Sequence, residues 1–240
     1  MESSQEAGEE GAMTPVEKRW RVIVIGGHTR SIGKTQLVCD VIAAFPEANW
    51  IAGKITQYGH GFCVKKGKHC DCAPDEHICA ISWENGSRPR TDSGRFLTAG
   101  ARKSFWLRTK QGYLAEGIPL LRAALEECER AAEGEARNLI LESNTLLDFV
   151  APSLYLVVLD PTKPDFKQSA RVWMDRASAF VLRGSLPGEG QNGPSTPWAG
   201  IASEALRKKP GFLQREGETL PRELRNEIHS VLQDFAGITV

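Results

Sequence analysis

The sequence predicts an α/β fold whose mostly parallel sheet is covered by helices on both faces. Short apolar runs rich in Val, Ile and Leu alternate along the chain with longer segments in which apolar residues recur at helical spacing. Such alternation is typical of β-α-β units, in which each helix carries the chain back to start the next parallel strand. The first apolar run ends in Gly26-Gly27, as expected of a buried strand closed by a glycine turn.

Six apolar runs are expected to form strands, because each is short and bounded by turn residues. They cover residues 22–25, 50–55, 104–107, 139–141, 155–159 and 179–182. Helical periodicity is clearest over residues 37–45, 118–128 and 221–235, and Pro46 ends the first of these segments. Cys39 and Cys128 fall on apolar helix faces and are expected in the core.

The composition is that of an ordinary globular protein, with 41% hydrophobic and 25% charged residues. Thirty basic and thirty acidic residues give a formal net charge of zero, so no overall field attracts nucleic acid or an anionic membrane. No apolar run approaches the roughly 20 residues that span a bilayer, and the N-terminus lacks the pattern of a secretory signal. We therefore expect a cytoplasmic protein that binds neither nucleic acid nor membrane.

A phosphate-binding loop is expected directly after the first strand. Gly33-Lys34-Thr35 stands between an apolar strand and an amphipathic helix, the context of the G-x-x-x-x-G-K-[ST] motif. In this motif backbone N–H groups and the helix N-terminus hold the phosphates, the lysine reaches the β- and γ-phosphates, and the hydroxyl binds Mg²⁺. The residues expected around the phosphates are Thr29, Arg30, Ser31, Ile32, Gly33, Lys34, Thr35 and Gln36.

One position departs from this motif, since His28 stands where its first glycine is expected. Histidine tolerates unusual backbone angles better than a β-branched residue, but it lacks the freedom for which glycine is used there. The alternative is a helix that happens to carry Gly-Lys-Thr at its start. The order of strand, loop and helix favours the phosphate loop, and hence a P-loop nucleotide-binding domain.

Acidic partners for Mg²⁺ are expected at the ends of other strands. The run 138–142 is apolar and ends in the carboxylate of Glu142, as a Walker B strand does. Asp92 and Asp160 are the alternatives. Lys34, Glu142 and Asp92 are therefore the candidate catalytic residues, and Thr35, Asp92 and Glu142 the candidate magnesium ligands.

The base of the nucleotide is less clearly marked than its phosphates. Thr162, Lys163 and Asp165 have the T-K-x-D form that recognises guanine in many GTPases, and they follow a strand. The proline-rich surroundings also suit an ordinary turn. Both GTP and ATP remain candidates for the nucleotide.

Cysteines gather in a segment that follows the second strand. Their spacing is C-x6-C-x-C-x6-C, with histidines at positions 60, 69 and 77 between and beside them. Thiolates and imidazoles at close spacing suit Zn²⁺ or an iron–sulfur cluster, and a metal would order a segment that has few apolar residues. The alternative is a set of free thiols in a flexible loop. The expected metal ligands are Cys63, Cys70, Cys72 and Cys79, with His60 as a substitute for the last.

These observations define the domain organisation. The first twelve residues carry four glutamates and no basic residue, which predicts a disordered acidic tail over residues 1–18. Residues 19–240 are expected to form one P-loop domain with an insertion over residues 57–91. A Gly-, Pro- and Ser-rich stretch predicts a mobile loop over residues 184–199.

Three stretches resemble one known family, the molybdopterin-guanine dinucleotide biosynthesis adapter proteins. They are the strand and loop over 22–35, the strand end Gly53-Lys54-Ile55-Thr56 with His60 following, and the segment 91–101 with its Asp-Ser pair and Ala-Gly-Ala turn. The resemblance covers roughly the first 110 residues. It implies a P-loop protein that binds GTP and assists attachment of GMP to molybdopterin, with Lys34 and Thr35 at phosphate and magnesium and Asp92 as a magnesium or switch residue.

Three functions follow from the sequence. The main one is Mg²⁺-dependent binding and weak hydrolysis of GTP, as an accessory to molybdenum-cofactor maturation. The second is an ATP-dependent enzyme that activates a small molecule, similar to dethiobiotin synthetase. The third is a metallochaperone or redox sensor in which the cysteine segment acts and the nucleotide gates it. The expected partners are a nucleoside triphosphate and a cofactor-maturation protein, with a homodimer as an option.

Overall fold

The structure is a computed structural model that describes residues 20–59, 77–86, 91–130, 137–184, 198, 201 and 206–233. The predicted acidic tail, most of the predicted mobile loop and three of the four candidate metal cysteines (Cys63, Cys70 and Cys72) lie outside these residues. Within them, no helix is long and apolar enough to cross a membrane.

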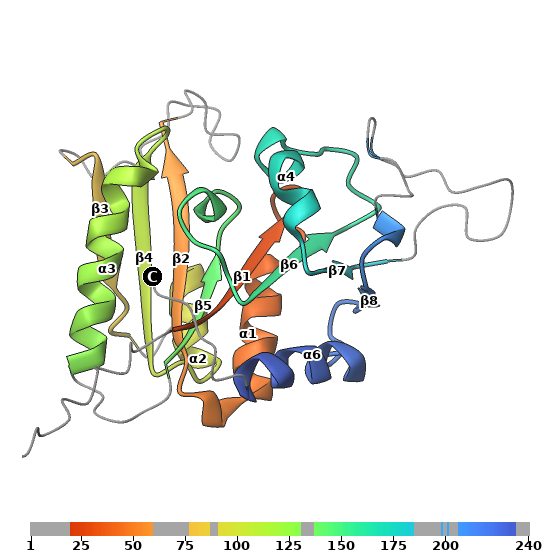
Figure 1. Cartoon of the computed structure of the whole chain (residues 1–240), viewed down its shortest axis with the longest axis horizontal. Helices are drawn as coiled ribbons and strands as arrows, with labels where there is room; N and C mark the ends of the chain where they lie inside the picture. The colour runs from red at the N-terminus through yellow and green to blue at the C-terminus, as the bar shows by residue number, and fades with distance from the viewer. Residues whose placement is uncertain are drawn as a thin grey trace, which may run out of the picture.

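The centre of the fold is a twisted sheet of eight strands in the order β3-β4-β2-β5-β1-β6-β7-β8 (Figure 1). All neighbouring strands run parallel except β3, which pairs antiparallel with β4 at one edge. The strands are β1 (Arg21–Gly27), β2 (Ile51–Tyr58), β3 (Cys79–Trp83), β4 (Lys103–Lys110), β5 (Asn138–Glu142), β6 (Leu154–Leu159), β7 (Ala179–Leu182) and β8 (Gly211–Leu213). The predicted α/β class with a mostly parallel sheet is confirmed.

The six predicted strands are all present, and two more are found. β3 lies inside the stretch predicted as an insertion between strands, and its five residues are only half-buried. β8 has three residues, two of them exposed. Edge strands bury little surface, so they lack the apolar runs by which inner strands are recognised. The stretch 57–91, predicted as an insertion after the second strand, therefore includes the end of β2 and the whole of β3.

Helices cover both faces of the sheet, and each face has its own core. One face carries α1 (Lys34–Ala44), α2 (Asp92–Thr98) and α6 (Arg222–Gln233), which Figure 1 shows grouped together. The opposite face carries α3 (Leu114–Arg130), α4 (Gln168–Trp173) and the short 3-10 turns η2 (Leu146–Asp148) and η3 (Met174–Arg176). Cys39 and Cys128 are buried in these two cores, as predicted.

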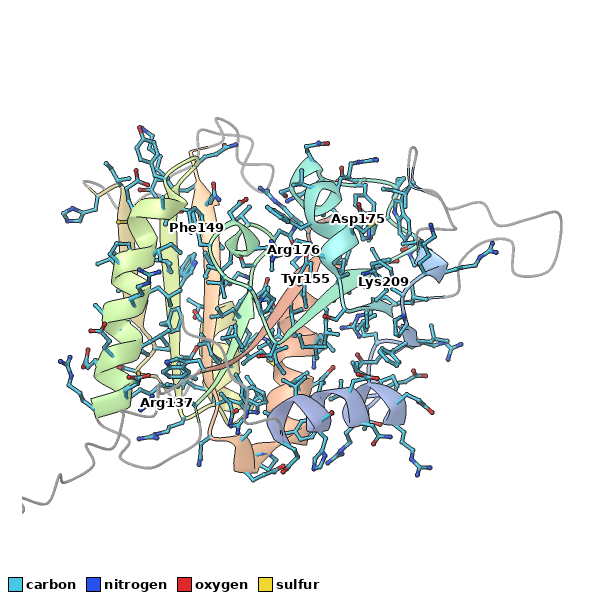
Figure 2. All side chains as sticks on the ribbon, in the orientation of Figure 1. Arg137, Phe149, Tyr155, Asp175, Arg176 and Lys209 are labelled. Atoms are coloured by element: carbon cyan, nitrogen blue, oxygen red, sulfur yellow. The ribbon has the colours of Figure 1, made fainter. Side chains whose placement is uncertain are left out.

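The second face is also tied together by polar contacts between its loops. Arg176, labelled in Figure 2, donates from Nη1 to the carbonyl of Leu147 at 2.8 Å. Lys209 donates to the carbonyl of Asp175 at 3.0 Å, and Arg137 forms an ion pair with Glu129 at 2.9 Å. These contacts tie the segments that precede β5, β7 and β8 to neighbouring parts of the chain.

Candidate nucleotide-binding site

The loop between β1 and α1 has the backbone expected of a phosphate cradle. Ser31 and Gly33 have positive φ angles of 54° and 84°, which turn the chain sharply before α1 begins at Lys34. Gly33 caps the helix without a side-chain hydrogen bond, and the first turn contains no acidic residue. The first backbone N–H groups of α1 are thus left without a side-chain acceptor, as at anion-binding helix N-termini.

His28 fills the position of the first motif glycine without needing glycine's backbone freedom, because its φ is not positive. Its side chain is fully buried. Nδ1 lies 2.8 Å from the carbonyl oxygen of Asp165, and Nε2 accepts from the backbone N–H of Asp160 at 3.1 Å. These partners require a neutral imidazole protonated at Nδ1. Burial lowers the pKa of His28 and keeps it in that form.

The imidazole of His28 also packs among aromatic rings. Its centroid lies 5.2 Å from that of Phe166 and 4.9 Å from that of Trp198. The backbone carbonyl of His28 accepts from Lys167 N at 2.9 Å. His28 therefore joins the phosphate loop to the loop that follows β6, which is a structural role that the sequence pattern did not reveal.

The segment predicted to recognise guanine lies in this loop after β6, and β6 pairs directly with β1. Thr29 donates its hydroxyl proton to the carboxylate of Asp165. Thr162 donates to Asp160 from its N–H at 2.9 Å and its hydroxyl at 2.7 Å, and the carbonyl of Lys163 accepts from Trp198. These contacts hold the loop against the phosphate loop, and guanine recognition by the segment stays a prediction.

Lys34 lies folded over the phosphate loop. Its Nζ donates to the carbonyl of Thr29 at 2.6 Å. Burial lowers the pKa of Lys34 to about 8, even though the nearby carboxylate of Glu142 acts in the opposite direction. The Lys34 ammonium is partly desolvated, and its hydrogen-bond acceptor is a neutral carbonyl. A bound phosphate would give it a negatively charged partner and so stabilise its charged form.

The predicted magnesium ligands lie at the start of α1 (Thr35), at the start of α2 (Asp92) and at the end of β5 (Glu142). Thr35 donates from Oγ1 to Oε2 of the buried Glu142 at 2.7 Å. Lys54, on β2, donates to Oε1 of Glu142 at 3.0 Å and to Oδ2 of Asp92 at 2.5 Å. Asp160, the third acidic candidate, instead accepts from Thr162 on the opposite side of the loop.

This donor set fits Mg²⁺. The ion prefers oxygen ligands and is usually held in proteins by one or two carboxylates together with substrate phosphates. Thr35 supplies a hydroxyl that contacts one oxygen of Glu142, and Lys54 joins the other oxygen of Glu142 to the carboxylate of Asp92. In the described part of the chain no three His, Cys, Asp or Glu side chains form a cluster that could hold a metal ion.

Two further residues that the sequence did not single out support the phosphate loop. Asn144, just after β5, accepts from Gly27 N at 2.8 Å and donates to Gly27 O at 2.8 Å. It thereby clamps the start of the loop to the Walker B strand. Arg183, just after β7, donates from Nη2 to the carbonyl of Gly33 at 2.8 Å. Both lie at the carboxyl edge of a parallel sheet, where ligand-binding residues collect, and this position was the signal available.

Gly26 is required by a close approach at the same place. A methyl group on its Cα would lie 2.6 Å from the Tyr155 hydroxyl and 2.9 Å from Oδ1 of Asn144. The Tyr155 hydroxyl is buried with no hydrogen-bond partner in the described residues. A side chain at position 26 therefore has no room beside Tyr155 and Asn144.

A cavity of about 1290 Å³ opens over these groups. One part is lined by the phosphate loop together with residues that follow β6, β7 and β8. The other part extends over the ends of β2, β4 and β5 and is lined by Thr56, Gln57, Tyr58, Trp106, Gln111 and Thr145. Lys54 and Glu142 line the cavity between these two parts.

Of the candidate metal cysteines, only Cys79 is described. It opens β3, is half-buried, and its thiol donates to the carbonyl of Glu116 at 3.4 Å. The metal centre predicted for Cys63, Cys70, Cys72 and Cys79 therefore stays a prediction. The segment between β2 and β3 leaves the sheet just after Tyr58, at the rim of the cavity.

No protein-family model matches this chain, and no curated protein matches it. Among solved structures, HypB from Helicobacter pylori in complex with nickel is similar to 91% of this chain over 89% of its own length, with a TM-score of 0.50 and 13% sequence identity. Identity at this level shows a shared fold and nothing finer. The chain has the α/β architecture of HypB.

Proposed function

We propose that this protein binds a magnesium–nucleoside triphosphate, GTP or ATP, on the loop between β1 and α1 and hydrolyses it slowly. One observation carries the proposal: the Lys34 ammonium, the Thr35 hydroxyl and the Glu142 carboxylate line one cavity beside an uncapped helix N-terminus. Lys34 and Thr35 stand at the lysine and hydroxyl positions of the P-loop motif, and Glu142 ends a buried strand, as a Walker B carboxylate does. The shared fold with HypB supports the same assignment.

In this proposal each residue has a separate task. The backbone of residues 31–36 and the positive end of α1 bind the phosphates. Lys34 exchanges its bond to the Thr29 carbonyl for the β- and γ-phosphates. Thr35, Glu142 and Asp92 hold the ion, which supplies positive charge to the phosphates when bound. The Glu142 carboxylate is buried, so it keeps a fixed orientation during hydrolysis.

We further propose that nucleotide turnover gates the handling of a transition metal by the cysteine segment. Two observations support this. The segment that carries Cys63, Cys70 and Cys72 starts at the rim of the cavity, after Tyr58. The fold is shared with a protein whose structure contains nickel. An accessory role in molybdenum-cofactor maturation rests on the sequence resemblance alone.

The second part of the cavity favours one other function. Ligand pockets commonly have volumes of about 300–1000 Å³, and the cavity of about 1290 Å³ is larger than this range. Its second part presents amide, hydroxyl and indole groups beside Lys54. This arrangement suits a polar small molecule that accepts a phosphoryl group, as in the ATP-dependent activating enzyme.

The proposal is tested by measuring nucleotide binding to the wild type and to Lys34→Ala. Fluorescent GTP and ATP analogues should bind the wild type in the presence of Mg²⁺, and Lys34→Ala should lose binding while its circular dichroism spectrum is unchanged. Lys110→Ala, at the exposed end of β4, is the matched control and should bind normally. Equal binding to wild type and to folded Lys34→Ala would refute the site.

The acidic residues are tested by isosteric amides. Glu142→Gln should keep nucleotide binding and lose most hydrolysis, because the amide retains the shape and loses the charge that orients the ion. Asp92→Asn should have the smaller effect, because the Asp92 side chain is 47% exposed whereas that of Glu142 is 7% exposed. The reverse order would show that Asp92 is the principal magnesium ligand.

A further inference from the structure

The Lys54 side chain lies among the groups proposed to bind magnesium. Its ammonium is 2.5 Å from Oδ2 of Asp92 and 3.0 Å from Oε1 of Glu142. The second oxygen of Glu142 accepts from Thr35, the hydroxyl of the phosphate loop. One ammonium thus bridges the two carboxylates that a divalent ion would bridge, and it is only 16% exposed.

The electrostatics of this cluster favour the ammonium in the nucleotide-free protein. The Lys54 ammonium lies within hydrogen-bond distance of one oxygen of each carboxylate, so the two negative groups hold it between them. Two carboxylates and one ammonium leave a net charge of minus one. Adding a divalent ion without moving Lys54 would place two positive groups on the same oxygens, which repel each other strongly at such distances.

The position of Lys54 also shows where the ammonium can go. Lys34 and Lys54 each interact electrostatically with Glu142 and with each other. Both line the cavity, Lys34 from the phosphate loop and Lys54 from β2, which is separated from β1 by β5 (Figure 1). A γ-phosphate bound by Lys34 would therefore lie within the field of Lys54. Its charge offers the ammonium a partner when the carboxylates are taken by a metal ion.

We propose that Lys54 is a phosphate-binding residue that occupies the magnesium position in the nucleotide-free protein and moves to the terminal phosphate when magnesium and nucleoside triphosphate bind together. This inference rests on the proposed nucleotide binding. Two effects of Lys54 on ligand binding follow. The residue suppresses binding of divalent ions without nucleotide, and it favours the triphosphate over the diphosphate, which lacks the terminal phosphate.

The first test uses Mn²⁺ alone, followed by electron paramagnetic resonance on the full chain without nucleotide. Wild type should bind Mn²⁺ weakly, and Lys54→Met should bind it about tenfold more tightly or better, because a neighbouring positive charge is removed. Lys110→Met removes the same charge at the exposed end of β4 and should resemble the wild type. The double variant Lys54→Met/Glu142→Gln should lose the gain, which identifies the carboxylate as the ligand.

The second test compares affinities for nucleoside triphosphate and diphosphate in the presence of Mg²⁺. In Lys54→Met the ratio of triphosphate affinity to diphosphate affinity should fall about tenfold, which corresponds to the loss of one charge-assisted hydrogen bond. The affinity for diphosphate should be unchanged. Unchanged Mn²⁺ binding together with an unchanged preference would overturn the proposal for Lys54. Failure of the wild type to bind any nucleotide would instead overturn the proposed function, so the two failures are distinguishable.

Discussion

Replacing His28 by glycine restores the phosphate-loop motif, and the structure predicts that this change damages the protein. His28 is fully buried and joins the phosphate loop to the loop after β6 through two hydrogen bonds and two ring contacts. Its backbone does not use the conformations that favour glycine. The variant His28→Gly therefore gains nothing from the consensus residue and loses a structural connection.

The expected loss of stability follows from these contacts. Removing a buried ring of this size costs about 3–5 kcal/mol in cores. The N–H of Asp160 and the carbonyl of Asp165 lose their partner, at about 1 kcal/mol or more each where water does not replace it. Because water can enter part of the space left by the ring, we expect His28→Gly to lower the free energy of unfolding by about 5 kcal/mol in total. The free energy of unfolding of a whole domain is about 5–15 kcal/mol, so this loss is a large part of it.

The assay is equilibrium urea unfolding followed by tryptophan fluorescence, since Trp198 contacts His28. The matched control is His229→Gly, the same substitution at an exposed position of α6, which should cost about 1 kcal/mol. His28→Phe keeps the ring and removes the hydrogen bonds, so its stability should fall between those of wild type and His28→Gly. A cost for His28→Gly no larger than that of His229→Gly would refute the structural role.

The same site predicts how stability depends on pH. The pKa of His28 is lowered from 6.5 by burial, so below pH 6.5 the unfolded chain takes up a proton that the folded chain does not. Stability should then fall by up to about 1.4 kcal/mol per pH unit as the pH drops from 6.5 towards the folded-state pKa. His28→Phe should lack this contribution. Parallel pH profiles of the two proteins would show that His28 is not buried in the neutral form.

Three more predictions concern the site and the cysteine segment. Because the pKa of Lys34 is about 8 in the nucleotide-free protein, affinity for inorganic triphosphate measured by calorimetry should be constant below pH 8 and weaken above it. Gly26→Ala should destabilise the fold by about 1–3 kcal/mol through contacts with Tyr155 and Asn144. In thermal unfolding, Tyr155→Phe should restore only part of this loss, because it removes the shortest of the contacts, and Gly211→Ala should be tolerated. Anaerobically purified protein should contain about one zinc ion or iron–sulfur cluster per chain, and elemental analysis showing none would remove the predicted centre.

Much of the fold could be predicted because inner parallel strands are apolar on both faces. The runs at β1, β5, β6 and β7 are almost fully buried, and each was recognisable as a short apolar stretch. β3 and β8 were missed because edge strands bury only part of their residues. α2 was missed because its seven residues are too few for periodicity to be read.

The phosphate loop was predictable for a different reason. Lys34 and Thr35 act within a few residues of one another on a local strand–loop–helix unit, so their spacing in the chain fixes their spacing in the site. Glu142 could be placed by the same logic, because the carboxyl ends of parallel strands meet at one edge of the sheet.

Only the tertiary structure decided how distant residues meet there. Lys54 is 88 positions from Glu142 in the chain and 38 from Asp92, yet it bridges both carboxylates. His28 pairs with the loop after β6 across more than 130 positions. No local sequence pattern predicts either contact, because each depends on which strands lie side by side in the sheet. The sequence by itself determined the fold class and the strand–loop–helix unit around Lys34, because these depend on periodicity and local spacing. The packing of non-adjacent strands decided which charges face each other.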